Sequence, residues 1–154
     1  MKKKSIQLFA FILLLTSMVS CSTENEYDSI TNSTIGSNES HNAGQNCMNC
    51  HKPGADEAPI WNVGGTIYNE ALTNTNSNAT VKLYTGSNGT GTLKYTFQVD
   101  AKGNFYTSGA IDFAGGLYPL VVGATSTKYM SSPITNGACN SCHTGTSTAR
   151  VWTN

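Results

Sequence analysis

The sequence is poor in charged residues, and a third of its positive charge lies in one place. Lys, Arg, Asp and Glu make up 12% of the 154 residues, and three of the nine basic residues are Lys2, Lys3 and Lys4. Without these three, six basic residues face nine acidic ones, and the formal net charge is −3. Such a chain has no basic patch for nucleic acid or anionic lipid. We therefore expect no nucleic-acid partner.

The motifs of several enzyme classes are missing as well. We find no Ser-His-Asp order, and the carboxylates are scattered rather than paired. The glycine-rich stretch 86-GSNGTG-91 lies between predicted strands, with no helix after it as a phosphate-binding loop requires. We therefore predict no catalytic residues.

No apolar run is long enough to cross a bilayer comfortably. The run from Leu8 to Leu15 has signal-peptide length and follows a positively charged start. It ends in 18-MVSC-21, which resembles the lipobox of bacterial lipoproteins, although that family more often has leucine where Met18 stands. The resemblance implies a signal peptide at residues 1–20 and lipidation of Cys21. The alternative is a plain secretory signal.

Residues 21–40 contain few apolar side chains and are expected to form a flexible tether, because they cannot offset the entropy of ordering. The stretch 22-STENEYD-28 resembles export signals that send some lipoproteins of one Gram-negative group to the cell surface; an acidic linker is the alternative. We expect an exported outer-membrane lipoprotein, on the periplasmic or the cell-surface face.

Residues 41–154 are predicted to form a single domain, whose core spans residues 62–124. Apolar and polar residues alternate there with a period of two, which predicts strands, and turn residues fill the gaps. We expect five to seven short strands in an all-β, antiparallel sandwich. The alternating apolar residues are Val81 and Leu83; Leu93, Tyr95, Phe97 and Val99; Phe105; and Tyr118, Leu120 and Val122.

Four segments carry a resemblance to a known family. They are 64-GGTIYN-69, 80-TVKLY-84, 99-VDAKGNFYT-107 and 117-LYPLVVG-123. Their order and composition are similar to those of carboxypeptidase regulatory-like and transthyretin-like domains. The resemblance implies a prealbumin-like sandwich and no particular chemistry.

One pentapeptide pattern occurs twice, as 47-CMNCH-51 and 139-CNSCH-143, and uses four of five cysteines and two of three histidines. Two thiols at this spacing can each add to a vinyl group of one porphyrin, and the following histidine can ligate the iron. Both copies resemble the haem-binding motifs of c-type cytochromes. The resemblance implies two covalent haem c groups, one on Cys47, Cys50 and His51, the other on Cys139, Cys142 and His143.

Two other chemistries compete for these cysteines. A zinc site of four thiolates suits each CxxC, but Cys50 and Cys139 lie 89 positions apart and the histidines stay unexplained. Disulfides form in exported proteins, yet this sandwich has a sufficient core without them.

The other face of each iron has one candidate ligand. His41 lies six residues before Cys47, a reach of roughly 20 Å when extended, and Met130 lies nine residues before Cys139. Which haem each residue would serve is open. The alternative for His41 is an exposed residue of the tether, and the alternative for Met130 is a side chain that only packs against its neighbours.

The first functional hypothesis is a dihaem c-type cytochrome that passes single electrons to other redox proteins from a lipid anchor in the outer membrane. A second copy of the same chain is a further candidate partner. The alternatives are a haem-based gas or peroxide sensor or enzyme, if one iron face is open, and a non-redox surface binding module with zinc or disulfides.

Overall fold

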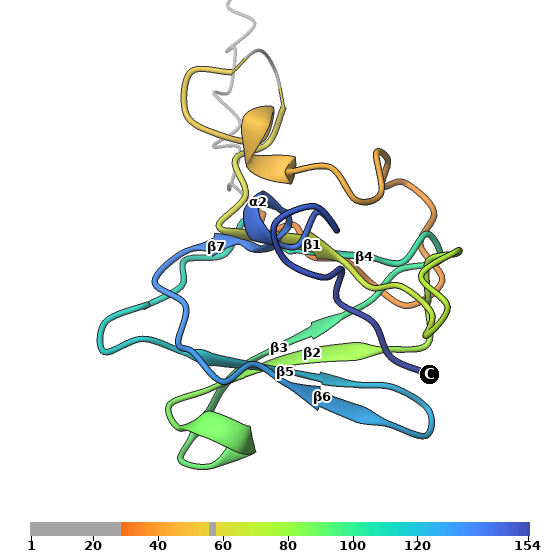
Figure 1. Ribbon diagram of the computed structural model, residues 1–154. Helices are drawn as coiled ribbons and strands as arrows, with labels where there is room; N and C mark the ends of the chain where they lie inside the picture. The colour runs from red at the N-terminus through yellow and green to blue at the C-terminus, as the bar shows by residue number, and fades with distance from the viewer. Residues whose placement is uncertain (1–28, 56–57) are drawn as a thin grey trace, which may run out of the picture.

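The computed structural model describes residues 29–55 and 58–154, which fold into two stacked β-sheets (Figure 1). The expected signal peptide, Cys21 and the acidic stretch at 22–28 lie outside these residues. The strands are β1 (Val63–Thr66), β2 (Thr80–Tyr84), β3 (Leu93–Gln98), β4 (Asn104–Thr107), β5 (Tyr118–Val122), β6 (Thr127–Tyr129) and β7 (Gly137–Ala138). The described helices are single turns: η1 (Cys47–Asn49), η2 (Ser87–Gly89) and α2 (Cys139–Cys142). The all-β class is confirmed, and no helix in the described ranges could cross a membrane.

The two sheets have the strand orders β4-β1-β7 and β3-β2-β5-β6. All strand pairs but one are antiparallel, as predicted; β1 and β7 are parallel. The parallel pair arises because residues 130–136 cross from β6 in one sheet to β7 in the other (Figure 1). This crossing brings the second pentapeptide directly to β1.

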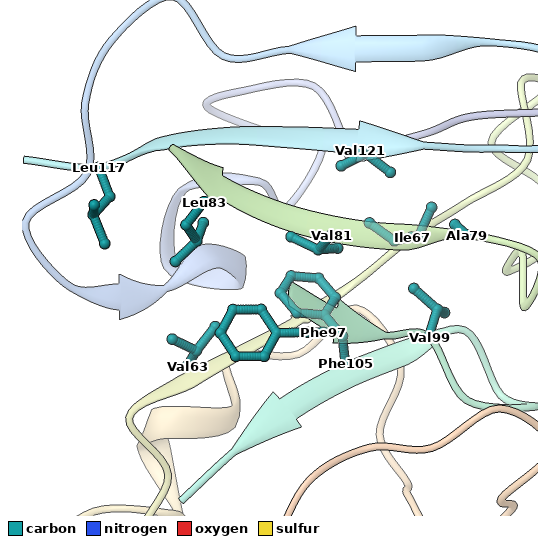
Figure 2. Packing of buried hydrophobic residues seen from close by; sticks show 10 residues of the cluster. All are labelled: Val63, Ile67, Ala79, Val81, Leu83, Phe97, Val99, Phe105, Leu117 and Val121. Atoms are coloured by element: carbon teal, nitrogen blue, oxygen red, sulfur yellow. The ribbon is translucent and has the colours of Figure 1, made fainter. Parts of the chain in front are cut away.

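The hydrophobic core lies between the sheets, and Figure 2 shows ten of its side chains. In β2, Val81 and Leu83 are buried as predicted. In β5 the predicted inward set is wrong: Val121 belongs to the core cluster, whereas Val122 is only half-buried. Leu120 is buried against Gly89 of η2 instead, since a Cβ atom at Gly89 would lie 2.9 Å from its methyl group. Because strand faces alternate, a shift by one residue reverses the inward set.

The turn between β3 and β4 follows local chemistry. One carboxylate oxygen of Asp100 accepts hydrogen bonds from the amides of Lys102 (2.9 Å) and Asn104 (3.0 Å). Gly103 has a φ of 82°, which glycine adopts without strain. The turn positions Asn104 and β4 for the contacts described below.

The segment before the first pentapeptide lies along β4. Asn32 forms a β-bridge with Thr107, and Ser33 is buried, donating to the Gln98 carbonyl at 2.6 Å and accepting from the Tyr106 amide at 3.0 Å. These contacts extend the ordered domain upstream of residue 41, because strand-edge groups at β4 provide partners that composition does not reveal.

Candidate functional site

Each pentapeptide folds into a single helical turn that gathers its two thiols and its histidine. The Cys47 carbonyl accepts from the His51 amide at 2.9 Å, and the Cys139 carbonyl from the His143 amide at 3.1 Å. Residues three apart lie on one face of a helical turn, so each turn presents both thiols on the same side. All four cysteines are free thiols.

Both histidines use the same ring nitrogen for an internal hydrogen bond. Nδ1 of His51 lies 2.8 Å from the Pro59 carbonyl oxygen, and Nδ1 of His143 lies 2.7 Å from that of Ala149. A carbonyl only accepts, so Nδ1 carries the proton and Nε2 keeps its lone pair. A metal-ligating histidine is usually oriented in this way by its other nitrogen. The histidines therefore fit an iron ligand at both sites.

The two turns lie against opposite faces of β1. A Cβ atom at Gly64 would lie 3.1 Å from the Cys47 Cβ atom, and one at Gly65 would lie 2.9 Å from that of Cys139. Adjacent strand residues point to opposite faces, so the two cysteines lie against the two sides of one backbone. The pentapeptides stand at the two ends of the predicted domain in sequence, but they are neighbours in space.

A buried asparagine inside the second pentapeptide links the two turns. Asn140 is 1% exposed and donates to the carbonyl of Gln45 (2.9 Å) and to Oγ1 of Thr66 (3.0 Å). Its own oxygen accepts from the Thr66 amide at 3.2 Å. Thr66 Oγ1 in turn accepts from the Gly44 amide at 2.9 Å. This network attaches the chain that leads into the first turn to β1 and α2.

Asn104 extends the network to the candidate ligand His41. Its amide oxygen lies 2.7 Å from Thr66 Oγ1, and its NH2 group donates to Ser40 Oγ at 2.9 Å. Sequence reasoning missed Asn140, Thr66 and Asn104. Nothing marks them in a chain this rich in Asn and Thr, because their importance comes from burial.

His41 faces the first turn. A pocket of about 280 Å³ is lined by His41, Cys47, Cys50 and His51. The centres of the two imidazole rings are 5.9 Å apart. His41 and His51 would be the residues that hold the iron of a group bound in this pocket.

An aromatic stack supports His51 from behind. The Trp61 ring centre lies 4.2 Å from that of His51 and 3.6 Å from that of Tyr106. Trp61 Nε1 is buried without a hydrogen-bond partner among the described residues. Burial raises the pKa of the Tyr106 hydroxyl, and the negative charges of Asp100 and Glu39 raise it further. The stack therefore keeps a neutral, apolar wall on this side of the pocket.

Met130 lines the same cavity as the second turn. A cavity of about 680 Å³ is lined by Met130, Cys139, Cys142 and His143, among others. The structure thus groups Met130 with the second turn and His41 with the first, and not in the crossed pairing. Trp152 also lines this cavity.

The geometry bears on the two alternative chemistries of the cysteines. In the described part of the chain, no three or more His, Cys, Asp or Glu side chains gather as a metal site, so the four thiolates do not form one tetrahedral set. Burial raises the pKa of the Cys139 thiol to about 12, with a smaller contribution from Cys47, and burial also raises the pKa of Cys47. Both side chains are therefore protonated thiols at neutral pH.

Comparisons with family models, curated proteins and solved structures find no match for this chain. The functional argument therefore depends on the residues of the site and not on the fold, which can host many functions.

Proposed function

We propose that the chain is a dihaem c-type cytochrome that carries single electrons. One observation carries the proposal: directly after each CxxC turn, a histidine has its Nδ1–H engaged by a backbone carbonyl and its Nε2 free. Two thiols and one correctly oriented imidazole are the groups that hold a covalent haem. Both turns present the same three groups, which supports two such sites.

The residues around each turn complete the ligand sets. Bound haem iron supplies reversible one-electron chemistry. His51 and His41 are the proposed ligands of the first site, and His143 and Met130 those of the second. Methionine favours reduced iron relative to a second histidine, so the second site has the higher reduction potential.

A candidate sixth ligand at both sites supports a carrier over a sensor or an enzyme, which would need an open iron face. The surroundings of the carrier follow from the beginning of the chain. We propose an exported lipoprotein, anchored in the outer membrane through Cys21, whose partners are other redox proteins. Residues 21–154 carry six basic and nine acidic side chains, a balance that favours protein partners over nucleic acid.

A haem stain on a denaturing gel and an intact mass test the proposal together, because covalent haem survives denaturation. We expect two haems on the mature protein, and one on either Cys50→Ala or Cys142→Ala, which replace exposed cysteines. The matched controls are Asn49→Ala and Ser141→Ala, exposed residues inside the same turns that should retain both haems. A mature protein with fewer than two haems contradicts the proposal.

Carbon monoxide distinguishes the carrier from the sensor or enzyme. With both irons fully ligated, the reduced protein should bind no carbon monoxide and keep its absorption spectrum. Rapid, stoichiometric binding in the unaltered protein would show an open iron face and favour the sensor or enzyme.

A further inference from the structure

The cavity beside the second turn is part of the sandwich interior. Its walls include Val63 and Phe105 from one sheet and Val81, Leu83 and Val121 from the other. All five side chains are at most 5% exposed and belong to the core cluster. These side chains form part of the wall of a space of about 680 Å³, and exposed residues such as Tyr129 form another part.

An apolar cleft of this size suits a ligand. Protein interiors pack as densely as organic crystals, and side chains that face open space lose dispersion partners there. The volume lies well inside the range of about 300–1,000 Å³ typical of small-molecule sites. A ligand in this cleft would therefore add to the packing of both sheets.

The residues at the rim identify an occupant. Cys139, Cys142 and His143 line the cavity, so a group attached to this turn is tethered to its wall. Met130 starts the crossing segment 130–136, every residue of which lines the cavity on the way from β6 to β7. The turn, the crossing segment and the two sheets border one open cleft.

The charges of the cavity match an apolar ring that carries carboxylates. Lys128 and Arg150 line it, and no Asp or Glu among the described residues does. The Lys128 ammonium lies 3.6 Å from the centre of the Trp152 ring, and the Arg150 guanidinium 4.5 Å from that of Tyr68. Aromatic faces hold a cation in place without neutralising it. The pocket at the first turn differs, because it is smaller and is lined by Glu39 and, in the part of the chain that the structure describes, by no lysine or arginine.

We propose that the haem of the second turn fills the space between the sheets as part of the hydrophobic core, with its propionates paired to Lys128 and Arg150. This inference rests on the proposed function. The sandwich then depends on the second haem for its stability. The first haem contributes little, because Phe105 is the one member of the core cluster among the described residues that line its pocket. The second pentapeptide is both a redox site and a folding element.

A matched pair of variants tests the structural role. Cys139→Ala/Cys142→Ala removes the second attachment and Cys47→Ala/Cys50→Ala the first, and intact mass should show one haem on each. In urea, the second-site variant should unfold at a clearly lower midpoint, or without a cooperative transition, and bind a hydrophobic dye. The first-site variant should unfold close to the parent protein. Equal midpoints for the two variants would overturn the inference.

Two charge variants test the propionate pairing in protein that keeps both haems, even if the second-site variant does not accumulate. Lys128→Gln and Arg150→Gln remove a positive charge that favours reduced iron. Each should shift one step of a redox titration by up to about tenfold in the equilibrium constant, or 59 mV to lower potential. Lys82→Gln is the control, because Lys82 points away from the core between Val81 and Leu83. Potentials that move no more than in this control would overturn the pairing.

The outcomes also separate the inference from the function on which it rests. A parent protein without covalent haem ends both. A parent protein with two haems, whose single-site variants are equally stable, leaves the cytochrome in place and removes only the structural role of the second haem.

Discussion

Asn140→Ala is the substitution with the clearest expected effect on stability. The side chain is 1% exposed and makes three hydrogen bonds, of 2.9, 3.0 and 3.2 Å, to Gln45 and Thr66. Its removal leaves the amide of Thr66, itself 2% exposed, without this partner. An unsatisfied buried donor costs about 1–3 kcal/mol, and each of the other two bonds about 1 kcal/mol. We expect a loss of about 3–5 kcal/mol in the free energy of unfolding.

Urea unfolding of the haem-loaded protein, followed by far-ultraviolet circular dichroism, measures this loss. For a domain of this size it corresponds to a decrease of roughly 10 °C in Tm. Asn49→Ala is the matched control, because Asn49 is an exposed asparagine in the other turn and should change stability by no more than about 0.5 kcal/mol. If Asn140→Ala destabilised the protein no more than Asn49→Ala, the network would not connect the two turns as described.

Four further variants test the ligands, the aromatic stack and the anchor. Met130→Ala should lower or abolish only the upper step of a two-step redox titration, and an unaltered titration would mean that the methionine is merely packed. His41→Ala should change only the lower step and open that iron to carbon monoxide; two unchanged steps would refute its ligation. The Tyr106 pKa is raised above about 10 in the folded state, so at alkaline pH the folded chain keeps a proton that the unfolded chain loses. The free energy of unfolding should therefore fall as pH rises beyond 10. Tyr106→Phe should reduce this alkaline loss of stability, and an identical pH profile would show that the hydroxyl contributes nothing. Cys21→Ala should release the protein from the membrane fraction, and a variant that still sediments with membranes would place the anchor elsewhere.

Local patterns predicted what depends on local chemistry. The alternation at Val81 and Leu83 predicted a strand with these two side chains facing the core. The turn at Asp100 and Gly103 has the conformation that those residue types favour. The two pentapeptides were found from spacing alone, because two thiols and a histidine must share one helical turn.

Long-range relations could not be obtained in this way. The sequence pattern does not distinguish Val121 from Val122, because both are apolar. Only the pairing of β5 with β2 decides which of the two faces the core. Asn140 is one of many asparagines, and burial alone distinguishes it. Cys47 and Cys139 both lie beside β1 because the chain crosses from β6 to β7. This crossing leaves no periodic pattern in the sequence.

The glycine pair of β1 also has a consequence for how such a chain could change over generations. Gly64 is constrained by Cys47, and Gly65 by Cys139 together with Phe105, whose ring would lie 2.6 Å from an added Cβ atom. A descendant that lost only the first CxxCH turn would be free to place a side chain at position 64, while position 65 stayed glycine. One that lost only the second would still meet the buried Phe105 ring at position 65 and should keep this glycine. Position 64 should thus vary in step with the first CxxCH turn, whereas position 65 should vary only where Phe105 changes as well.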